Sequence, residues 1–277
     1  MIKKILIAVS STGGHIYPGL ALAGELKKSG YEVTFVGKKS EIISREGYPL
    51  FTISARGLKR KSIFGMISFF AACFAAGLQS AYILVKTKPS LVLGFGGYIS
   101  FPVIVAARML GIRSIIHEQN SIPGLANKYS ARFADKICVS FQNTEKYFPA
   151  GKTVFTGDPV RKSILDIKRE TRPAEGPVTV LVFGGSQGAR GINSAMAEKA
   201  ERFAAVSGKL KLIHITGEKD FENVRSAYER SGLAAEVHAY LFDIEKAYKR
   251  CSLAVCRAGA TTIAELIALK LPAILVP

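Results

Sequence analysis

The sequence predicts an α/β protein with two Rossmann-like domains, each built on a parallel β-sheet covered by helices. Short apolar runs rich in β-branched residues alternate with helix-length amphipathic segments, which is typical of parallel sheets. The charged stretch from Arg161 to Pro177 contains two prolines and interrupts this alternation, so it is interpreted as a linker. After it, a strand, a glycine turn and an amphipathic helix follow one another again, as they do at the start of the chain.

The first domain is predicted over residues 1–162. Its first strand is KILIAVS, and after a glycine turn a helix is expected from about Ile16 to Ser29. Further strands are predicted at EVTFV, SLVLGF, RSIIHE and KICVS. The second domain is predicted over residues 163–277. It opens with VTVLVFGGSQGARGINSAMAEKA, which repeats the strand, turn and helix of KKILIAVSSTGGHIYPGLALAGEL.

Composition narrows the classes of partner. The 277 residues are 48% hydrophobic and carry a formal charge of +17, which indicates a folded protein that binds an anionic partner. The four cysteines have no metal-ligand spacing, and we interpret them as core residues. The N-terminus lacks the apolar run and cleavage site of a secretory signal, so the cytoplasm is the expected compartment.

Each domain has a glycine turn that is a candidate phosphate site. Glycines between a strand and a helix let backbone N–H groups at the positive helix end approach a phosphate. A plain strand-to-helix connection is the alternative for either turn taken alone. Neither turn has the GxGxxG spacing followed by an acidic residue, which argues against a dinucleotide cofactor, and neither has a Walker-type GK[ST].

Six motifs together carry a family resemblance. They are STGGHIYPG, LGFGGYISFP, HEQNSIPGLANK, GDPVR, GGSQGARGIN and CRAGATTIAEL, and they follow in this order along nearly the whole chain. The chain resembles glycosyltransferase family 28, whose members have the GT-B fold. This resemblance implies parallel sheets that face a central cleft, with the lipid acceptor held by the first domain and the UDP-sugar by the second. The family pattern continues past LPAILVP, so the second domain is expected to be incomplete.

The resemblance implies an inverting glycosyltransferase of peptidoglycan synthesis. Such an enzyme moves N-acetylglucosamine from UDP-GlcNAc to the C4 hydroxyl of the muramyl sugar in undecaprenyl-linked lipid I, giving lipid II. Two alternatives stay open: a UDP-sugar epimerase or hydrolase of the same fold, and a non-catalytic membrane- or nucleic-acid-binding fragment. Dependence of UDP release on a lipid acceptor discriminates the first reading from both alternatives.

The substrate-binding residues follow from the resemblance, motif by motif. They fall on Thr12, Gly13, Gly14, Asn120, Arg161, Ser186, Leu241, Ala260, Thr261, Thr262 and Glu265. Thr261 and Thr262 would hold the diphosphate at a helix N-terminus, and Leu241 would contact uracil through its backbone. Glu265 would accept hydroxyl protons of the ribose; an ordinary first-turn carboxylate is its alternative. Arg161 suits bidentate contact with phosphate, against the alternative of a solvated linker charge.

His15 is the candidate general base, because a glycosyl acceptor must lose its hydroxyl proton as it attacks. It follows Gly13 and Gly14 at a helix start, and capping or packing of that loop is its alternative role. A second candidate pair is His117 and Glu118 of HEQN, which would alternatively support their loop.

The remaining histidines and the absence of a metal-binding motif complete the prediction of the catalytic groups. His214 and His238 are expected to be core or edge histidines. No Asp-x-Asp pair is present, so no metal or other cofactor is expected. The charge of the leaving UDP must then be met by helix ends, hydroxyl groups and Arg161.

A long uncharged segment runs from Ser62 to Val85, flanked by bases. It is long enough to span a bilayer, but a span would place the first glycine turn and all later motifs on opposite faces of the membrane. We therefore predict a surface helix or hairpin that enters the inner leaflet, making the protein peripheral at the cytoplasmic face; a buried core helix is the alternative. The expected phospholipid contact is residues 56–88, with headgroups bound by Arg56, Lys59, Arg60, Lys61, Lys86 and Lys88. Nucleic acid is not expected, because the charge comes with no stacking or zinc-finger signature.

Overall fold

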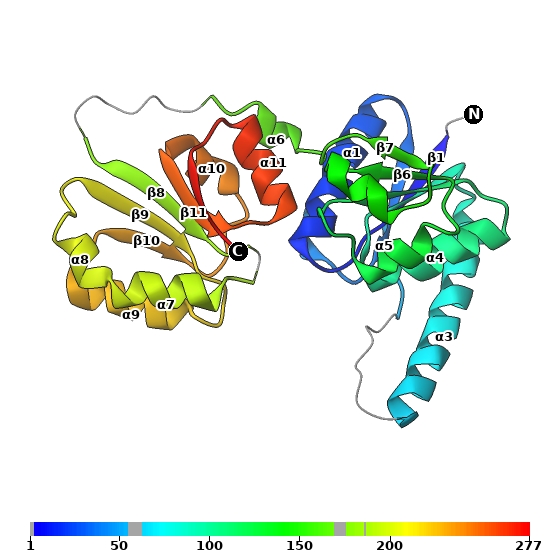
Figure 1. The fold of residues 1–277 in the computed structure, drawn as a ribbon, viewed down its shortest axis with the longest axis horizontal. Helices are drawn as coiled ribbons and strands as arrows, with labels where there is room; N and C mark the ends of the chain where they lie inside the picture. The colour runs from blue at the N-terminus through cyan, green and yellow to red at the C-terminus, as the bar shows by residue number, and fades with distance from the viewer. Residues whose placement is uncertain (1–2, 55–62, 169–175, 186) are drawn as a thin grey trace. The chain divides into compact units, whose positions relative to one another are not determined.

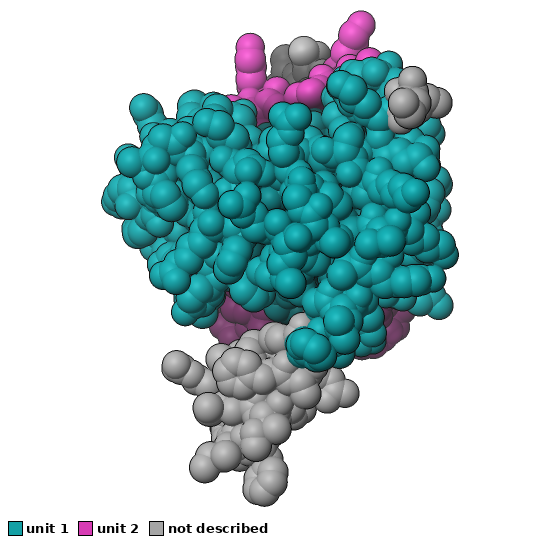
Figure 2. All heavy atoms as spheres, turned by 90° about the vertical axis from the view of Figure 1, so that its right-hand side faces the viewer, with its two compact units in different colours: residues 1–161 teal, residues 162–277 magenta. Residues whose placement is uncertain are grey.

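The structure, a computed structural model, describes residues 3–54, 63–168, 176–185 and 187–277, with the backbone alone for residues 63–71 and 73. It divides into two compact units, residues 1–161 and 162–277, which we call unit 1 and unit 2 (Figure 2). The boundary expected from the sequence, after residue 162, lies one residue further along the chain. Each unit is an α/β body with a parallel sheet, so the predicted fold class is confirmed.

Unit 1 contains a seven-stranded sheet in the order β3-β2-β1-β4-β5-β6-β7. Its strands are β1 (Lys4–Ala8), β2 (Glu32–Gly37), β3 (Leu50–Thr52), β4 (Leu91–Gly94), β5 (Ser114–Glu118), β6 (Lys136–Val139) and β7 (Thr153–Phe155). Its helices are α1 (Gly13–Lys28), α2 (Glu41–Arg45), α3 (Ile63–Thr87), α4 (Gly97–Met109), α5 (Leu125–Ser130) and the 3-10 helix η1 (Gln142–Tyr147). Apolar side chains of the central strands fill both faces, with α1 over one and α3 and α4 over the other.

Unit 2 contains a five-stranded sheet in the order β10-β9-β8-β11-β12. Its strands are β8 (Val178–Phe183), β9 (Leu210–Ile215), β10 (Ala235–His238), β11 (Leu253–Arg257) and β12 (Ala273–Val276). Its helices are α6 (Lys162–Leu165), α7 (Arg190–Glu198), α8 (Ala200–Ala204), α9 (Phe221–Ser231), α10 (Ile244–Arg250) and α11 (Ala260–Ala268). Helices α7 and α9 lie side by side on one face of β8, β9 and β10 (Figure 1).

The two sheets share a topological feature that places their functional loops. In each, the chain starts at an inner strand, builds outward in one direction, and then returns to build in the other. The reversal lies between β1 and β4 in unit 1 and between β8 and β11 in unit 2. Open parallel sheets bind ligands at such switch points, beyond the carboxyl ends of the strands. The glycine turns of both units follow β1 and β8, directly at these points.

Two elements differ in detail from the sequence-based expectation. Helix α1 begins at Gly13 instead of about Ile16, because the Thr12 carbonyl already accepts hydrogen bonds from the backbone N–H groups of His15 and Ile16. The apolar segment from Ser62 to Val85 is one helix, α3, over its described part, and not a hairpin. Across the described residues we find no helix with both the length and the apolar character needed to cross a membrane.

Candidate functional site

The turn after β1 places His15 within the first turn of α1. The His15 imidazole Nδ1 lies 2.6 Å from the hydroxyl of Thr12, the residue that precedes the helix. Burial lowers the pKa of His15 below its ordinary value of 6.5, so the ring is neutral over a wider pH range. Gly14 is exposed, and a Cβ added there would meet no atom within 4 Å, which leaves its backbone accessible. The predicted residues Thr12, Gly13, Gly14 and His15 therefore form one compact turn.

The turn after β4 closes around the other side of the His15 ring. Gly96 has φ +88°, and a Cβ added there would lie 3.3–3.4 Å from the ring atoms Cδ2 and Nε2. Gly97 has φ +76°, and its Cβ would clash with Ser10 at 2.3 Å. Both positions thus require glycine. Sequence reasoning named no site residue here, although the GFGGY motif at the start of α4 was visible.

Glu118, a candidate catalytic residue, is buried at the end of β5 and organises the loop that follows. Its Oε1 accepts hydrogen bonds from the backbone and the side-chain amide of Asn120, at 2.9 and 3.1 Å. Its Oε2 accepts bonds from the Gly124 backbone at 3.1 Å and from the Asn127 side chain at 2.9 Å. Both carboxylate oxygens are engaged within the loop, so the geometry favours loop support over proton transfer for Glu118. Asn120 itself is exposed.

His117 links β5 to the GDPVR segment after β7. Its Nε2–H donates to the Gly157 carbonyl at 3.0 Å, and its Nδ1 lies 3.9 Å from a carboxylate oxygen of Asp158. Burial lowers the pKa of His117 to about 4, although the bond to the Gly157 carbonyl opposes the shift. The ring is therefore neutral, and its bond to Gly157 holds the segment after β7, which favours a structural role for His117 over proton transfer. Asp158, whose side chain is 2% exposed, was not singled out from the sequence.

Arg161 is held at the end of unit 1 by an aromatic contact. Its guanidinium carbon lies 4.2 Å from the ring centroid of Tyr17, in the first turns of α1. Stacking of this kind fixes the plane of a guanidinium while leaving its edge able to form hydrogen bonds. Arg161 is half-buried, and so the alternative of a fully solvated linker charge does not describe it.

In unit 2, helix α11 begins directly after β11. Gly259 precedes the helix with extended backbone, and Ala260, Thr261 and Thr262 form its first turn. The N–H groups of a first turn have no partner within the helix, and the helix dipole favours an anion there. Glu265 lies one turn later, is 6% exposed, and accepts a hydrogen bond from the Tyr248 hydroxyl at 3.0 Å. Tyr248 thus fixes the carboxylate, a contact that sequence reasoning missed.

Two further residues predicted to bind the donor are Ser186 and Leu241. Ser186 falls outside the described residues. The neighbouring Gly188 has φ +73°, and a Cβ there would lie 1.8 Å from the Thr216 carbonyl oxygen. Leu241 is half-buried in the loop after β10, between Tyr240 and Phe242, whose rings pack edge to face at 4.6 Å.

The other histidines and the cysteines are not among the residues predicted to bind substrate or to catalyse the reaction. His214 is fully buried and both ring nitrogens have hydrogen-bond partners, so its prediction as a core histidine is confirmed. Cys251 and Cys256 are buried, as expected, whereas Cys138 is half-buried. The side chain of Cys73 is not described. Within the described ranges, no three His, Cys, Asp or Glu side chains come together as a metal site would require.

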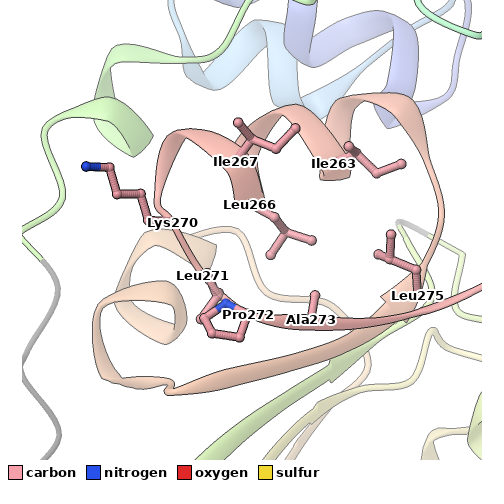
Figure 3. Close-up of a pocket in the computed structure, with 8 residues that line it drawn as sticks. All are labelled: Ile263, Leu266, Ile267, Lys270, Leu271, Pro272, Ala273 and Leu275. Atoms are coloured by element: carbon pink, nitrogen blue, oxygen red, sulfur yellow. The ribbon is translucent and has the colours of Figure 1, made fainter.

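A groove of about 430 Å³ lies in unit 2 between α11 and residues 270–275, which lead into β12 and include part of it (Figure 3). Its lining is apolar apart from one lysine, and comprises Ile263, Leu266, Ile267, Lys270, Leu271, Pro272, Ala273 and Leu275. None of the predicted substrate-binding residues lines it. Ligand sites combine apolar walls with a few converging polar groups, so this groove is a poor candidate for the donor site.

Comparison with known proteins gives a consistent result. Residues 5–139 match the glycosyltransferase family 28 N-terminal domain, and residues 179–277 match the C-terminal domain of the same family. A UDP-N-acetylglucosamine--N-acetylmuramyl-(pentapeptide) pyrophosphoryl-undecaprenol N-acetylglucosamine transferase of Geotalea uraniireducens is 45% identical over 99% of this chain and 78% of its own length. The enzyme of the same name from Myxococcus xanthus is 41% identical over 99% of this chain and 73% of its own.

Solved structures show the same likeness. MurG of Acinetobacter baumannii superposes with a TM-score of 0.73 and 30% identity, over 99% of this chain and 78% of that one. UDP-GlcNAc 2-epimerase of Neisseria meningitidis, solved with UDP-GlcNAc, has a TM-score of 0.66 at 12% identity, over 98% of this chain and 82% of its own. At that identity the epimerase shares the fold alone.

Proposed function

The chain belongs to glycosyltransferase family 28, and from this we propose that it is an inverting transferase that moves N-acetylglucosamine from UDP-GlcNAc to undecaprenyl-linked lipid I. The acceptor atom is the C4 hydroxyl of the muramyl sugar, and the product is lipid II. The observation that carries the proposal is the 45% identity, along nearly the whole chain, to a relative named for this transfer. The position of His15, beside a hydroxyl partner and close to the glycines after β4, supports it.

His15 acts as the base in this mechanism. This role requires the tautomer in which Nδ1–H donates to the Thr12 hydroxyl, 2.6 Å away, and Nε2 keeps a lone pair on the side of Gly96. Nε2 takes the proton of the acceptor hydroxyl while the hydroxyl oxygen attacks the anomeric carbon of the donor. The bond from that carbon to the UDP oxygen breaks, and UDP leaves with the electron pair. A single displacement of this kind inverts the anomeric carbon.

The leaving diphosphate is stabilised by fixed dipoles of unit 2. The first-turn amides and hydroxyls at Thr261 and Thr262 of α11 meet the developing negative charge. In unit 1, the guanidinium of Arg161, stacked on Tyr17, is the candidate cation for a phosphate group. Gly14 and Asn120 of unit 1, both exposed, are further candidate polar contacts, whereas Gly13 is buried. No step in this sequence of bond changes requires a metal ion.

Acceptor dependence tests the function. Incubation with UDP-GlcNAc and a short-chain lipid I analogue should release UDP and produce the disaccharide product, whereas UDP-GlcNAc alone should be stable. Release of free N-acetylglucosamine or formation of an epimer without acceptor would contradict the proposal and favour the hydrolase or epimerase alternative.

Glu265 is expected to recognise the ribose of the donor. Changing Glu265→Gln keeps an acceptor for the Tyr248 hydroxyl but removes the negative charge, so UDP affinity should fall about tenfold. Calorimetric titration with UDP and with 2′-deoxy-UDP measures this. Wild type should prefer UDP, and E265Q should lose that preference. The matched control is Tyr248→Phe, which removes the partner hydroxyl but retains the carboxylate. A preference for UDP in E265Q equal to that of wild type would refute the ribose contact.

We further propose that unit 1 attaches peripherally to the cytoplasmic face of the membrane through α3. Phe74, Leu78, Tyr82 and Val85 recur every three or four residues on this helix and are 58–71% exposed. Large apolar side chains in such a row are unusual on a protein surface in water and are typical of interfacial helices. Lys86 and Lys88 at the end of α3 supply positive charge next to the row. Arg56, Lys59, Arg60 and Lys61 lie outside the described residues.

The double change Phe74→Ser and Leu78→Ser should weaken binding to vesicles that contain anionic phospholipid by about tenfold or more, since each side chain contributes apolar area to insertion. Co-sedimentation with vesicles measures the effect. Ile274→Ser is the control, because Ile274 is similarly exposed but belongs to unit 2. Equal binding of the double variant and wild type would argue against α3 as the membrane contact.

A further inference from the structure

A buried polar network crosses the core of unit 2. His214 on β9 and Asn193 on α7 are 0% and 1% exposed, and Tyr228 on α9 is 2% exposed. The His214 Nδ1 lies 2.8 Å from the Tyr228 hydroxyl, and its Nε2 lies 3.1 Å from Oδ1 of Asn193. Polar groups buried in this way cost folding free energy unless they are paired, and here they are paired in a chain.

The directions of these hydrogen bonds follow from their outer partners. Nδ2 of Asn193 donates to the Thr216 carbonyl at 2.8 Å and to Oδ2 of Asp220 at 2.7 Å, and both are acceptors. Oδ1 of Asn193 must therefore accept from His214, so the proton of the neutral imidazole is on Nε2. Nδ1 then accepts from the Tyr228 hydroxyl. Burial lowers the pKa of His214 to about 4, which agrees with a neutral ring.

Thr216 is the point at which this network reaches the loops at the carboxyl edge of the sheet. Its backbone N–H donates to the His238 carbonyl at 2.9 Å, so it holds the start of the loop after β10, and its hydroxyl lies 3.0 Å from the Gly217 carbonyl and 3.3 Å from that of His238. Its carbonyl oxygen lies so close to Gly188 that only glycine fits there. Gly217 approaches the Gln187 carbonyl in the same way. The loops after β8, β9 and β10 therefore meet at Thr216 and Gly217.

We infer that Asn193 is a positioning residue, which holds these three loops in the shape that receives a nucleoside diphosphate. The inference rests on the proposed function, because it concerns the same donor site. Asn193 is too deeply buried to touch a ligand, so it acts through the Thr216 carbonyl. From there the effect reaches the glycine turn next to the expected phosphate site and the loop of Leu241, next to the expected uracil site.

The inference predicts different effects on UDP affinity for changes at the two ends of the network, Asn193 and Tyr228. Asn193→Ala removes both bonds that fix the Thr216 segment, so the affinity for UDP should fall about tenfold, with a matching rise in the KM for UDP-GlcNAc and little change in kcat. Tyr228→Phe removes the hydroxyl at the far end and leaves the Asn193 bonds to Thr216 and Asp220 in place. It should lower the resistance to denaturant but leave UDP affinity unchanged.

The experiment compares both variants with wild type by calorimetric titration with UDP and by amide hydrogen exchange without ligand. Asn193→Ala should weaken UDP binding and speed exchange in residues 216–217 and 239–243, whereas Tyr228→Phe should do neither. Unchanged affinity and exchange in N193A, or equal losses in Y228F, would overturn the inference. If N193A does not fold, Asn193→Leu provides the test: it fills a similar volume but also removes the bond to the Thr216 carbonyl, and unchanged affinity and exchange would again overturn the inference.

Failure of the proposed function has a different signature. Wild type that shows no UDP binding would contradict that function. The exchange comparison would still decide whether Asn193 holds the loops, because it needs no ligand.

Discussion

His15→Ala is expected to lower kcat for transfer to lipid I about 10²–10⁴-fold, the usual contribution of a positioned general base. The reason is that the variant has no base beside the glycines after β4 to take the proton from the hydroxyl of the acceptor sugar. UDP affinity should change little, because the residues expected to hold uracil, ribose and most of the diphosphate belong to unit 2. Steady-state kinetics and calorimetric titration with UDP separate the two effects.

The pH dependence provides the control for this prediction. A base must be neutral to act, and burial lowers the pKa of His15. The acid limb of the kcat/KM profile should therefore lie below the ordinary histidine value of 6.5, and activity should be lost as pH falls through the lowered pKa.

Thr12→Val, which removes the partner of Nδ1, should reduce kcat, whereas Thr12→Ser should retain it. A kcat of His15→Ala within tenfold of wild type would exclude His15 as the base.

Gly188→Ala is expected to destabilise unit 2 by about 3 kcal/mol or more and to abolish UDP binding. The added methyl group would lie 1.8 Å from the Thr216 carbonyl oxygen, on a backbone with φ +73°. Neither the turn after β8 nor the segment after β9 can accommodate it without moving. Denaturant unfolding and UDP titration measure the two losses.

Gly232→Ala is the matched control for backbone strain. Gly232 ends α9 with φ +69°, and no atom lies within 4 Å of an added Cβ. This change should carry only the backbone cost of about 1–2 kcal/mol and leave UDP affinity unchanged. If both alanine variants lose the same stability and retain UDP binding, the close approach of the two loops does not matter for the donor site.

The regular part of the fold could be predicted from the sequence because it depends on local patterns. The strands beginning at Lys4, Glu32, Leu91, Ser114 and Lys136 are apolar, β-branched runs separated by helices. The edge strands β3 and β7 are only three residues long, with partly exposed side chains, and give no such pattern. Helix α3 was recognised as apolar, but whether such a segment folds as one helix or two depends on packing against the rest of the chain.

The candidate site was predictable as a set of loops, but its internal contacts were not. Glycine turns and helix starts can be predicted from a few neighbouring residues, and so Thr12, His15 and Thr261 could be found. The contact of Gly96 with the His15 ring, and that of Tyr248 with Glu265, join residues far apart in sequence. Likewise, Glu118 could be read as a base or as a support until its four loop partners were known.

Each unit contains one histidine that is uncharged in its interior, His117 in unit 1 and His214 in unit 2, both with a pKa of about 4. In the unfolded chain the same side chains titrate near 6.5. Unfolding in mildly acidic solution is therefore coupled to proton uptake in both units. Their contribution to folding stability is complete above about pH 6.5 and is lost as the pH falls toward 4, so acidification weakens each of the two units.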